Sequence, residues 1–240
     1  MLKNTKYVYL NNNKKILVIV ESGFSGDFKS SIVRDSTSYF SKFSDTLSIQ
    51  YCQDETFFQD SYFELKDMTF QKYLEIFNSV LSKIEVDKYD KLFYIAHSFQ
   101  ALVILYIYAN LKKEIRDKIN IILWDPSTSS NISRVIKSDF KLIDNQYENY
   151  TLIKDYAWIF SKQIVVDIMN FDFLKVYKSI LIKKLIISAE KAGAFLSETY
   201  TKDNKNIIYH VIKNSGHMFG VTKCRRELFK LTKNFILDIF

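Results

Sequence analysis

The stretch "FYIAHSFQALVILYIYANL", residues 93–111, joins two apolar runs through a short polar interruption. Residues 91–96 read as a buried strand, and residues 98–112 are apolar nearly all round, as in a central helix. His97 and Ser98 lie at the junction, with no loop between the two runs. The junction therefore predicts either a helix start capped by serine or a nucleophile held on a sharp turn.

Strands and helices alternate over most of the chain around this junction. Apolar runs bounded by Asn, Asp and Ser predict strands at residues 7–10, 15–21, 46–53, 91–96, 119–124, 184–189 and 207–212. Apolar residues at helical spacing predict helices at residues 27–43, 69–86, 98–112 and 221–239. Such alternation is typical of an α/β fold, in which helices cover both faces of a mostly parallel sheet.

Residues 127–182 interrupt the alternation, because they show several helical patterns and no convincing strand. The segment includes the aromatic-rich stretch "NYTLIKDYAWIFSKQIVVDIMNFDF", residues 149–173. A helical insertion between two sheet strands is a candidate cap over a site at the strand ends. We therefore expect one domain over residues 1–240, with a helical cap at 127–182.

Composition favours an ordinary globular protein, with 48% hydrophobic and 25% charged residues. The net charge is +7, but the lysines are mixed with acidic residues, as in "NLKKEIRDKIN" at 110–120. This mixing favours solvated faces over a nucleic-acid groove. The N-terminus lacks the apolar core of a signal peptide, and no run is long enough for a transmembrane helix. We therefore expect a cytoplasmic protein.

Polar residues follow several predicted strands, at the edge where open α/β sheets bind ligands. They are Glu21 to Gly26, His97, Ser98, Asp125, Glu190 and His217. A serine hydroxyl becomes a good nucleophile when a base such as histidine takes its proton, and a carboxylate orients that base. Two N–H donors would stabilise the oxyanion, and we expect them to be the amides of Phe99 and Phe24. His97 and His210 are expected to be structural.

Three segments together resemble the α/β-hydrolase family. "YIAHSFQA" (94–101) resembles the G-x-S-x-G nucleophile elbow, which follows a strand and opens a helix. "SGH" (215–217) is similar to the family's histidine loop, and "VESGFSGD" (20–27) occupies the place of its oxyanion loop. The similarity in element order runs from about residue 7 to 240. It implies that Ser98 is the nucleophile, His217 the base and 127–182 the cap.

The sequence departs from the family pattern at three places. Ala96 and Gln100 stand where the elbow usually has glycines, and Gln100 needs extra space beside the neighbouring strand. The early loop lacks the usual His-Gly pair. Ala192 stands where the family most often places its acid.

Two carboxylates are candidates for the acid. Asp125 follows the strand at 119–124, a place where some family members resemble this chain in carrying the acid, including thioesterase domains of peptide and polyketide synthesis. Alternatively, Asp125 only caps the turn at Pro126. Glu190 is the second candidate, and the absence of any functional acid is the third reading.

The expected function is a serine hydrolase that cleaves an ester or thioester through an acyl-enzyme on Ser98. The substrate would be a small acyl or lipophilic molecule, free or attached to a carrier. No cofactor or metal is expected, and Cys52 and Cys224 lack metal-ligand spacing. Two alternatives remain open, namely an acyltransferase using the same site and a non-catalytic binding protein with this fold.

Overall fold

The computed structural model describes residues 6–23, 30–51, 62–65, 68–128, 132, 140–141, 149–154, 156–192 and 205–239. Within these residues, seven strands form one sheet in the order β1–β3–β2–β5–β6–β10–β11. The strands are β1 (Lys6–Leu10), β2 (Ile16–Glu21), β3 (Asp45–Gln50), β5 (Lys91–His97), β6 (Ile119–Trp124), β10 (Lys184–Ala189) and β11 (Ile207–Ile212). Only β1 runs antiparallel to its neighbour in this sheet. The predicted α/β class and mostly parallel sheet are confirmed.

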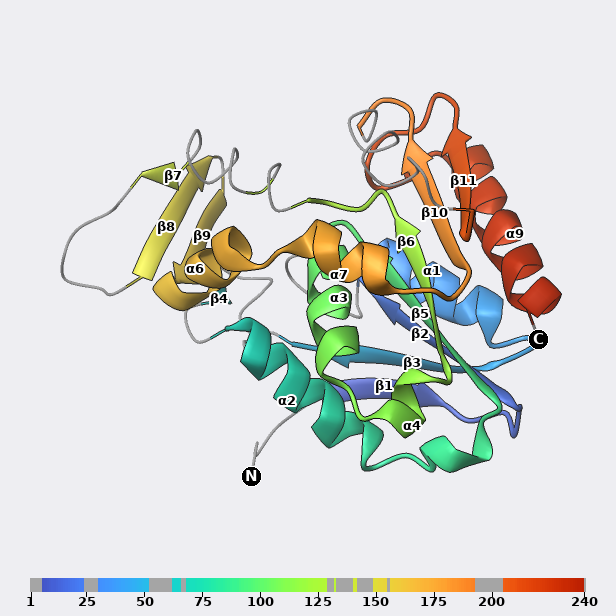
Figure 1. Ribbon diagram of the computed structural model, residues 1–240. Helices are drawn as coiled ribbons and strands as arrows, with labels where there is room; N and C mark the ends of the chain where they lie inside the picture. Colours follow the sequence, from blue (N-terminus) through green and yellow to red (C-terminus); the bar gives the residue numbers. More distant parts are fainter. Residues whose placement is uncertain are drawn as a thin grey trace.

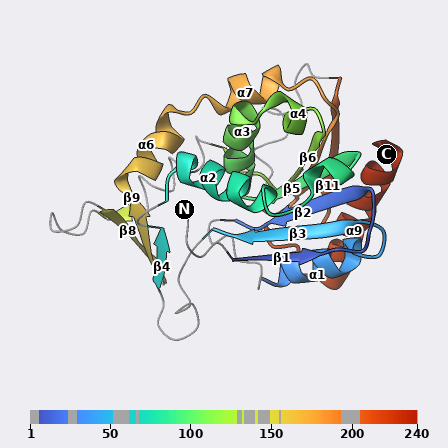
Figure 2. The same cartoon turned by 90° about the horizontal axis from the view of Figure 1, so that it is seen from below.

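Helices cover both faces of this sheet (Figure 2). On one side lie α1 (Ser31–Phe40) and α9 (Thr222–Ile239), and on the other lie α2 (Phe70–Leu81), α3 (Gln100–Asn110) and α7 (Phe173–Ser179). Two short helices, η1 (Val86–Lys88) and α4 (Lys113–Arg116), lie in the connections before β5 and β6. The strand and helix positions predicted from apolar periodicity for this sheet agree with the structure to within a few residues.

The sheet separates two apolar clusters, because successive side chains of a strand point to opposite faces. On β5, Leu92 and Tyr94 pack in the cluster under α2 and α3, whereas Phe93 and Ile95 pack in the cluster under α1 and α9. Strands buried on both faces need apolar residues at every position, which explains their continuous runs. Burial of each large apolar side chain contributes about 1.5–3 kcal/mol.

The segment 127–182 contains strands as well as helices, so the prediction of a purely helical cap is wrong. A second sheet has the order β4–β9–β8–β7, formed by β4 (Tyr62–Leu65), β7 (Phe140–Lys141), β8 (Asn149–Lys154) and β9 (Tyr156–Ser161). Helices α6 (Lys162–Asn170) and α7 follow it. Figure 1 shows this sheet set apart from the main one, beside α6. The apolar spacing of residues 149–161 fits a helix as well as a strand, but here β8 and β9 form an antiparallel hairpin and β9 also pairs with the distant strand β4.

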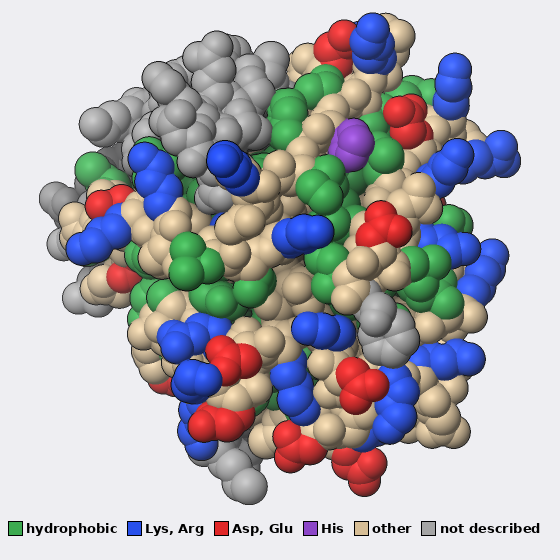
Figure 3. Space-filling model, turned by 45° about the vertical axis from the view of Figure 1, so that its right-hand side comes forward, with side chains coloured by type: hydrophobic (Ala, Val, Ile, Leu, Met, Phe, Trp, Pro, Cys, Tyr) green, Lys and Arg blue, Asp and Glu red, His purple; other side chains and the backbone are tan. Residues whose placement is uncertain are grey.

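The molecular surface carries charges of both signs. On the face shown in Figure 3, Lys and Arg side chains are interspersed with Asp and Glu. None of the described helices combines the length and the apolar character needed to cross a bilayer.

Candidate active site

Ser98 lies on a tight turn between β5 and α3, with a backbone φ of 57°. Non-glycine residues rarely adopt this left-handed conformation, because Cβ then crowds the following carbonyl. The turn is held by bonds from Ser98 N to Trp124 O and from Ser127 N to Ser98 O, each 3.0 Å long. The N-cap of α3 is Phe99, and no side chain caps it. The alternative reading of Ser98 as the helix cap is therefore wrong.

His217 lies in the loop between β11 and α9, and its ring is in hydrogen-bond distance of Ser98. Its Nε2 lies 2.9 Å from Ser98 Oγ, and its Nδ1 lies 2.5 Å from Asp125 Oδ2. These contacts fit the tautomer in which Nδ1–H donates to the carboxylate and Nε2 accepts the serine proton. The ring is 42% exposed, so that water and a substrate can reach it, whereas the Asp125 side chain is only 2% exposed.

Asp125 follows β6 and has a backbone φ of 40°. Its Oδ1 accepts a 3.0 Å hydrogen bond from Ala189 N at the end of β10, which orients the carboxylate. Its Oδ2 is thereby directed at His217. Both carboxylate oxygens therefore contact groups other than the turn at Pro126. Because β6 and β10 are neighbours in the sheet, a residue at the end of β6 reaches across to the histidine loop.

Glu190, the alternative acid, lies at a different place. Its Oε2 accepts a 2.7 Å hydrogen bond from Asn214 N, in the turn before His217. Asp125 is thus the described carboxylate in contact with the His217 ring, and Glu190 supports the backbone of the same loop.

Comparisons with known proteins bear on this arrangement. No protein-family model and no curated protein matches the sequence. Among solved structures, the chain is similar to Est1E from Butyrivibrio proteoclasticus, with 18% identity, a TM-score of 0.72, and coverage of 98% of this chain and 93% of that one. It is also similar to alpha/beta hydrolase domain-containing protein 10 from mouse, with 11% identity, a TM-score of 0.68, and coverage of 98% and 95%. The chain has the α/β-hydrolase fold.

The similarity to MenH from S. aureus has 15% identity and a TM-score of 0.64 and covers 99% of both chains.

The two residues that depart from the usual elbow pattern of the α/β-hydrolases, Ala96 and Gln100, are both buried. Ala96 is buried in the apolar cluster under α3, where its methyl group packs. Gln100 is completely buried at the first position of α3, and neither its Oε1 nor its Nε2 has a hydrogen-bond partner among the described residues.

We expect Gln100→Met to raise the free energy of unfolding by about 1 kcal/mol, because it removes two buried polar atoms while keeping the side-chain volume. Urea denaturation of both proteins measures this difference. A variant that is less stable than the wild type would contradict the prediction and show that the amide is paired.

Gly23, just after β2, lies close to the nucleophile. A Cβ built on Gly23 would lie 3.7 Å from Ser98 Cβ, in ordinary van der Waals contact. Phe24, the predicted donor on this loop, lies outside the described residues. Phe99, the other predicted donor, is buried at the N-terminus of α3, where backbone N–H groups favour a negative charge.

Glu21 occupies the end of β2, and the residue is 1% exposed. Its Oε1 accepts a 2.8 Å hydrogen bond from Ile49 N, and its Oε2 has no partner among the described residues. Burial raises the pKa of Glu21 well above its ordinary value and outweighs the effect of the bond from Ile49. The carboxyl group is therefore neutral in the folded protein at pH values where it would ionise in the unfolded chain.

This shift predicts a pH-dependent effect of Glu21→Gln. Stability that depends on the neutral carboxyl group is complete below its ordinary pKa and falls as the pH rises through the folded-state pKa. Relative to the wild type, the variant should gain up to about 1.4 kcal/mol of unfolding free energy per pH unit in that range. Urea denaturation at pH 5 and pH 8 measures the gain. The control Glu227→Gln, at an exposed site on α9, should show no such trend, and a pH-independent effect of Glu21→Gln would contradict the explanation.

Ser127 is a residue near the nucleophile that the sequence analysis missed. Its Oγ lies 3.5 Å from Ser98 Oγ, and its amide donates to Ser98 O. Its position two residues after Asp125 could have indicated it from the sequence, because the chain that follows β6 runs directly beside the turn that carries Ser98.

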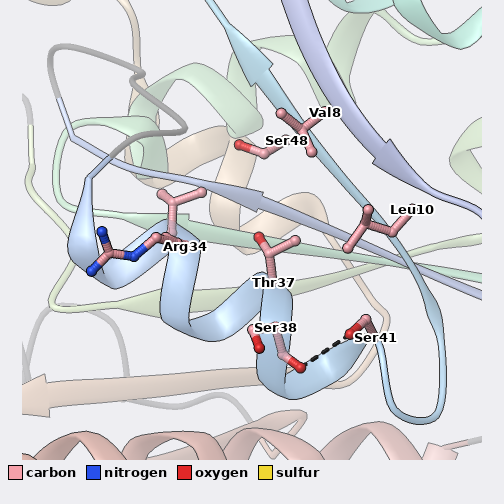
Figure 4. Close-up of a pocket in the computed structure, with 8 residues that line it drawn as sticks. Val8, Leu10, Arg34, Thr37, Ser38, Ser41 and Ser48 are labelled. Carbon is pink, nitrogen blue, oxygen red and sulfur yellow. Dashed lines mark hydrogen bonds between the residues drawn. The ribbon is translucent and has the colours of Figure 1, made fainter.

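A separate hollow of about 500 Å³ lies between α1 and the outer strands β1 and β3 (Figure 4). It is lined by Val8, Leu10, Val33, Arg34, Thr37, Ser38, Ser41 and Ser48. None of the predicted site residues lines it. Among the described residues, no cluster of His, Cys, Asp and Glu has the arrangement of a metal site, and Cys224 is a buried free thiol.

Proposed function

We propose that this protein is a serine hydrolase that cleaves an ester or thioester through an acyl-enzyme on Ser98. The observation that carries the proposal is the continuous contact from Ser98 Oγ to His217 Nε2 and from His217 Nδ1 to Asp125 Oδ2. A hydroxyl, an imidazole and a carboxylate in this order are what proton transfer from the nucleophile requires. Hydrolases among the proteins of similar fold add support to the reaction class.

In the first step, His217 Nε2 takes the Ser98 proton while Oγ attacks the acyl carbon. Asp125 stabilises the resulting imidazolium and keeps its Nδ1–H oriented. The carbonyl oxygen becomes an oxyanion, which the amides of Phe99 and Phe24 are proposed to stabilise. The imidazolium then protonates the leaving alkoxide or thiolate as its bond to the acyl carbon breaks.

In the second step, His217 takes a proton from water, and the hydroxide oxygen attacks the acyl carbon of the acyl-Ser98 ester. The new tetrahedral species collapses, the acid product leaves, and the proton on His217 returns to Ser98 Oγ. The residues named above therefore complete the cycle with water as the only further reactant. An acyl or lipophilic substrate is proposed, with segment 127–182 as the cap.

A fluorophosphonate probe tests the proposal, because it phosphonylates an activated serine. The wild-type protein should be labelled at Ser98 by peptide mapping, His217→Ala should be labelled slowly, and Ser98→Ala should not be labelled. A series of acyl esters and thioesters of increasing chain length would then define the substrate class. A folded wild-type protein that resists labelling would contradict the hydrolase and favour the non-catalytic binding protein. Transfer of the acyl group to an added alcohol in preference to water would favour the acyltransferase.

A further inference from the structure

The loop that carries His217, residues 213–221, has three consecutive backbone carbonyls bound by side chains from outside the loop. The His217 carbonyl lies 2.9 Å from His97 Nε2. The Met218 and Phe219 carbonyls accept from Arg225 Nη2 at 3.3 Å and from Arg225 Nε at 3.2 Å. We call His97 and Arg225 the loop clamp.

His97 contacts the same residue as Ser98, but at a different group. Ser98 Oγ contacts the ring of His217, and His97 Nε2 contacts its carbonyl. The two imidazole rings also lie close, with their centroids 4.6 Å apart. Because His97 and Ser98 are adjacent in the chain, the end of β5 carries both the nucleophile and an anchor for its base.

Arg225 connects the loop to α1. Its Nη1 donates a 2.6 Å hydrogen bond to Asp35 Oδ2 on α1, and its side chain is only 15% exposed. The planar guanidinium group can direct several N–H donors at once, so it serves two loop carbonyls and a carboxylate together. The ion pair with Asp35 also offsets the positive charge of Arg225.

The loop has a conformation that needs such support. Asn214 and Phe219 have backbone φ values of 57° and 47°, a conformation that asparagine tolerates but that is unfavourable for a bulky residue such as Phe219. Strained backbone persists where surrounding contacts hold it, and it concentrates at functional sites. Without those contacts, the loop would relax and the His217 ring would move relative to Ser98.

The chemistry of His97 suits a position beside a base that becomes charged. Burial and the nearby His217 lower the pKa of His97 to about 4. His97 is therefore neutral at neutral pH and, as the tautomer that carries its proton on Nε2, donates to the His217 carbonyl. A neutral donor does not repel the imidazolium that forms on His217 during turnover.

We propose that His97 and Arg225 are positioning residues, which hold residues 217–219 so that His217 Nε2 stays within hydrogen-bond distance of Ser98. The inference rests on the proposed function of the Ser98 site. Neither side chain is assigned a contact with the substrate or the reacting atoms.

The test compares His97→Phe and Arg225→Met, which remove the donors, with Arg226→Met, an exposed neighbour on α9 that serves as the control. We expect each clamp variant to lower kcat per labelled Ser98 by about 10- to 100-fold, with KM changed less than about twofold, because small displacements of a catalytic group are costly. His97→Gln should recover most of the lost activity, because its amide can donate in place of Nε2. Arg225→Lys should not, because a single ammonium nitrogen cannot take the places of Nε, Nη1 and Nη2 at the two carbonyls and Asp35.

A further readout separates positioning from a general loss of stability. Hydrogen exchange of the amides in 213–221 should accelerate in both clamp variants, with protection in the sheet unchanged. Variants that keep wild-type kcat per labelled site, or a His97→Gln that is as impaired as His97→Phe, would overturn the proposal.

Failure of the hydrolase proposal and failure of the loop-clamp proposal would give different experimental results. A wild-type protein that neither turns over esters nor labels at Ser98 contradicts the hydrolase itself. A wild-type protein that does both, with clamp variants that match it, contradicts only the clamp.

Discussion

Ser98→Ala is expected to reduce kcat for ester hydrolysis by about 10⁴- to 10⁶-fold, which is the scale on which removal of a nucleophile acts. The variant lacks the only atom that can form the acyl-enzyme in the proposed cycle. His217 Nε2 would then lose the hydroxyl that lies 2.9 Å from it. Initial rates with a chromogenic ester, compared at equal concentrations of folded protein, measure the loss.

Ser127→Ala is the matched control for this variant. Its hydroxyl lies 3.5 Å from Ser98 Oγ, but the proposed cycle uses no chemistry at Ser127. We expect a decrease of less than about tenfold, consistent with the loss of one weak neutral hydrogen bond. If Ser98→Ala stayed active while Ser127→Ala did not, the nucleophile would be Ser127 and the assignment would be wrong.

Asp125→Asn should lower kcat by about 10³- to 10⁴-fold while leaving the fold intact. Asparagine can keep the bond from Ala189 N through its carbonyl oxygen, but its NH₂ group then faces His217 Nδ1. That arrangement favours the tautomer with the proton on Nε2, which cannot accept a proton from Ser98. The pH–rate profile and circular dichroism of the variant distinguish this effect from unfolding.

Glu190→Gln provides the comparison, since Glu190 is the other carboxylate near this loop. Its contact is with Asn214 N, and a glutamine oxygen can accept the same bond. We expect activity within about threefold of the wild type, because a neutral acceptor weakens one exposed hydrogen bond only slightly. A collapse of activity in Glu190→Gln, with Asp125→Asn unaffected, would reverse the assignment of the acid.

The main sheet could be predicted from the sequence because its central strands are buried on both faces. A strand such as β6, Ile119–Trp124, is then apolar at nearly every position, and this signal is local. The helices likewise show their buried faces as apolar residues at helical spacing. In the second sheet β8 and β9 form a local hairpin, but their aromatic-rich stretch also fits a helical pattern, and the pairing of β9 with β4 spans many residues of intervening chain. Pairing between distant strands is a tertiary property.

For the site, local sequence was sufficient to single out Ser98, because a strand, a tight turn and a helix meet there without a loop. The sequence also identified His217 as the residue to examine after the last strand. It left the acid open between Asp125 and Glu190, and it treated His97 as an unspecified structural residue. Each of these residues ends a strand or lies just beyond one.

What the sequence determined by itself was the set of polar groups at the carboxyl ends of the strands. Only the tertiary structure decided which of them touch, because contact depends on the lateral order β5–β6–β10–β11. That order directs Asp125 from β6 toward His217, and it leaves Glu190 on the backbone of the turn at Asn214. Lateral order arises from the packing of the whole sheet, and no short stretch of residues encodes it.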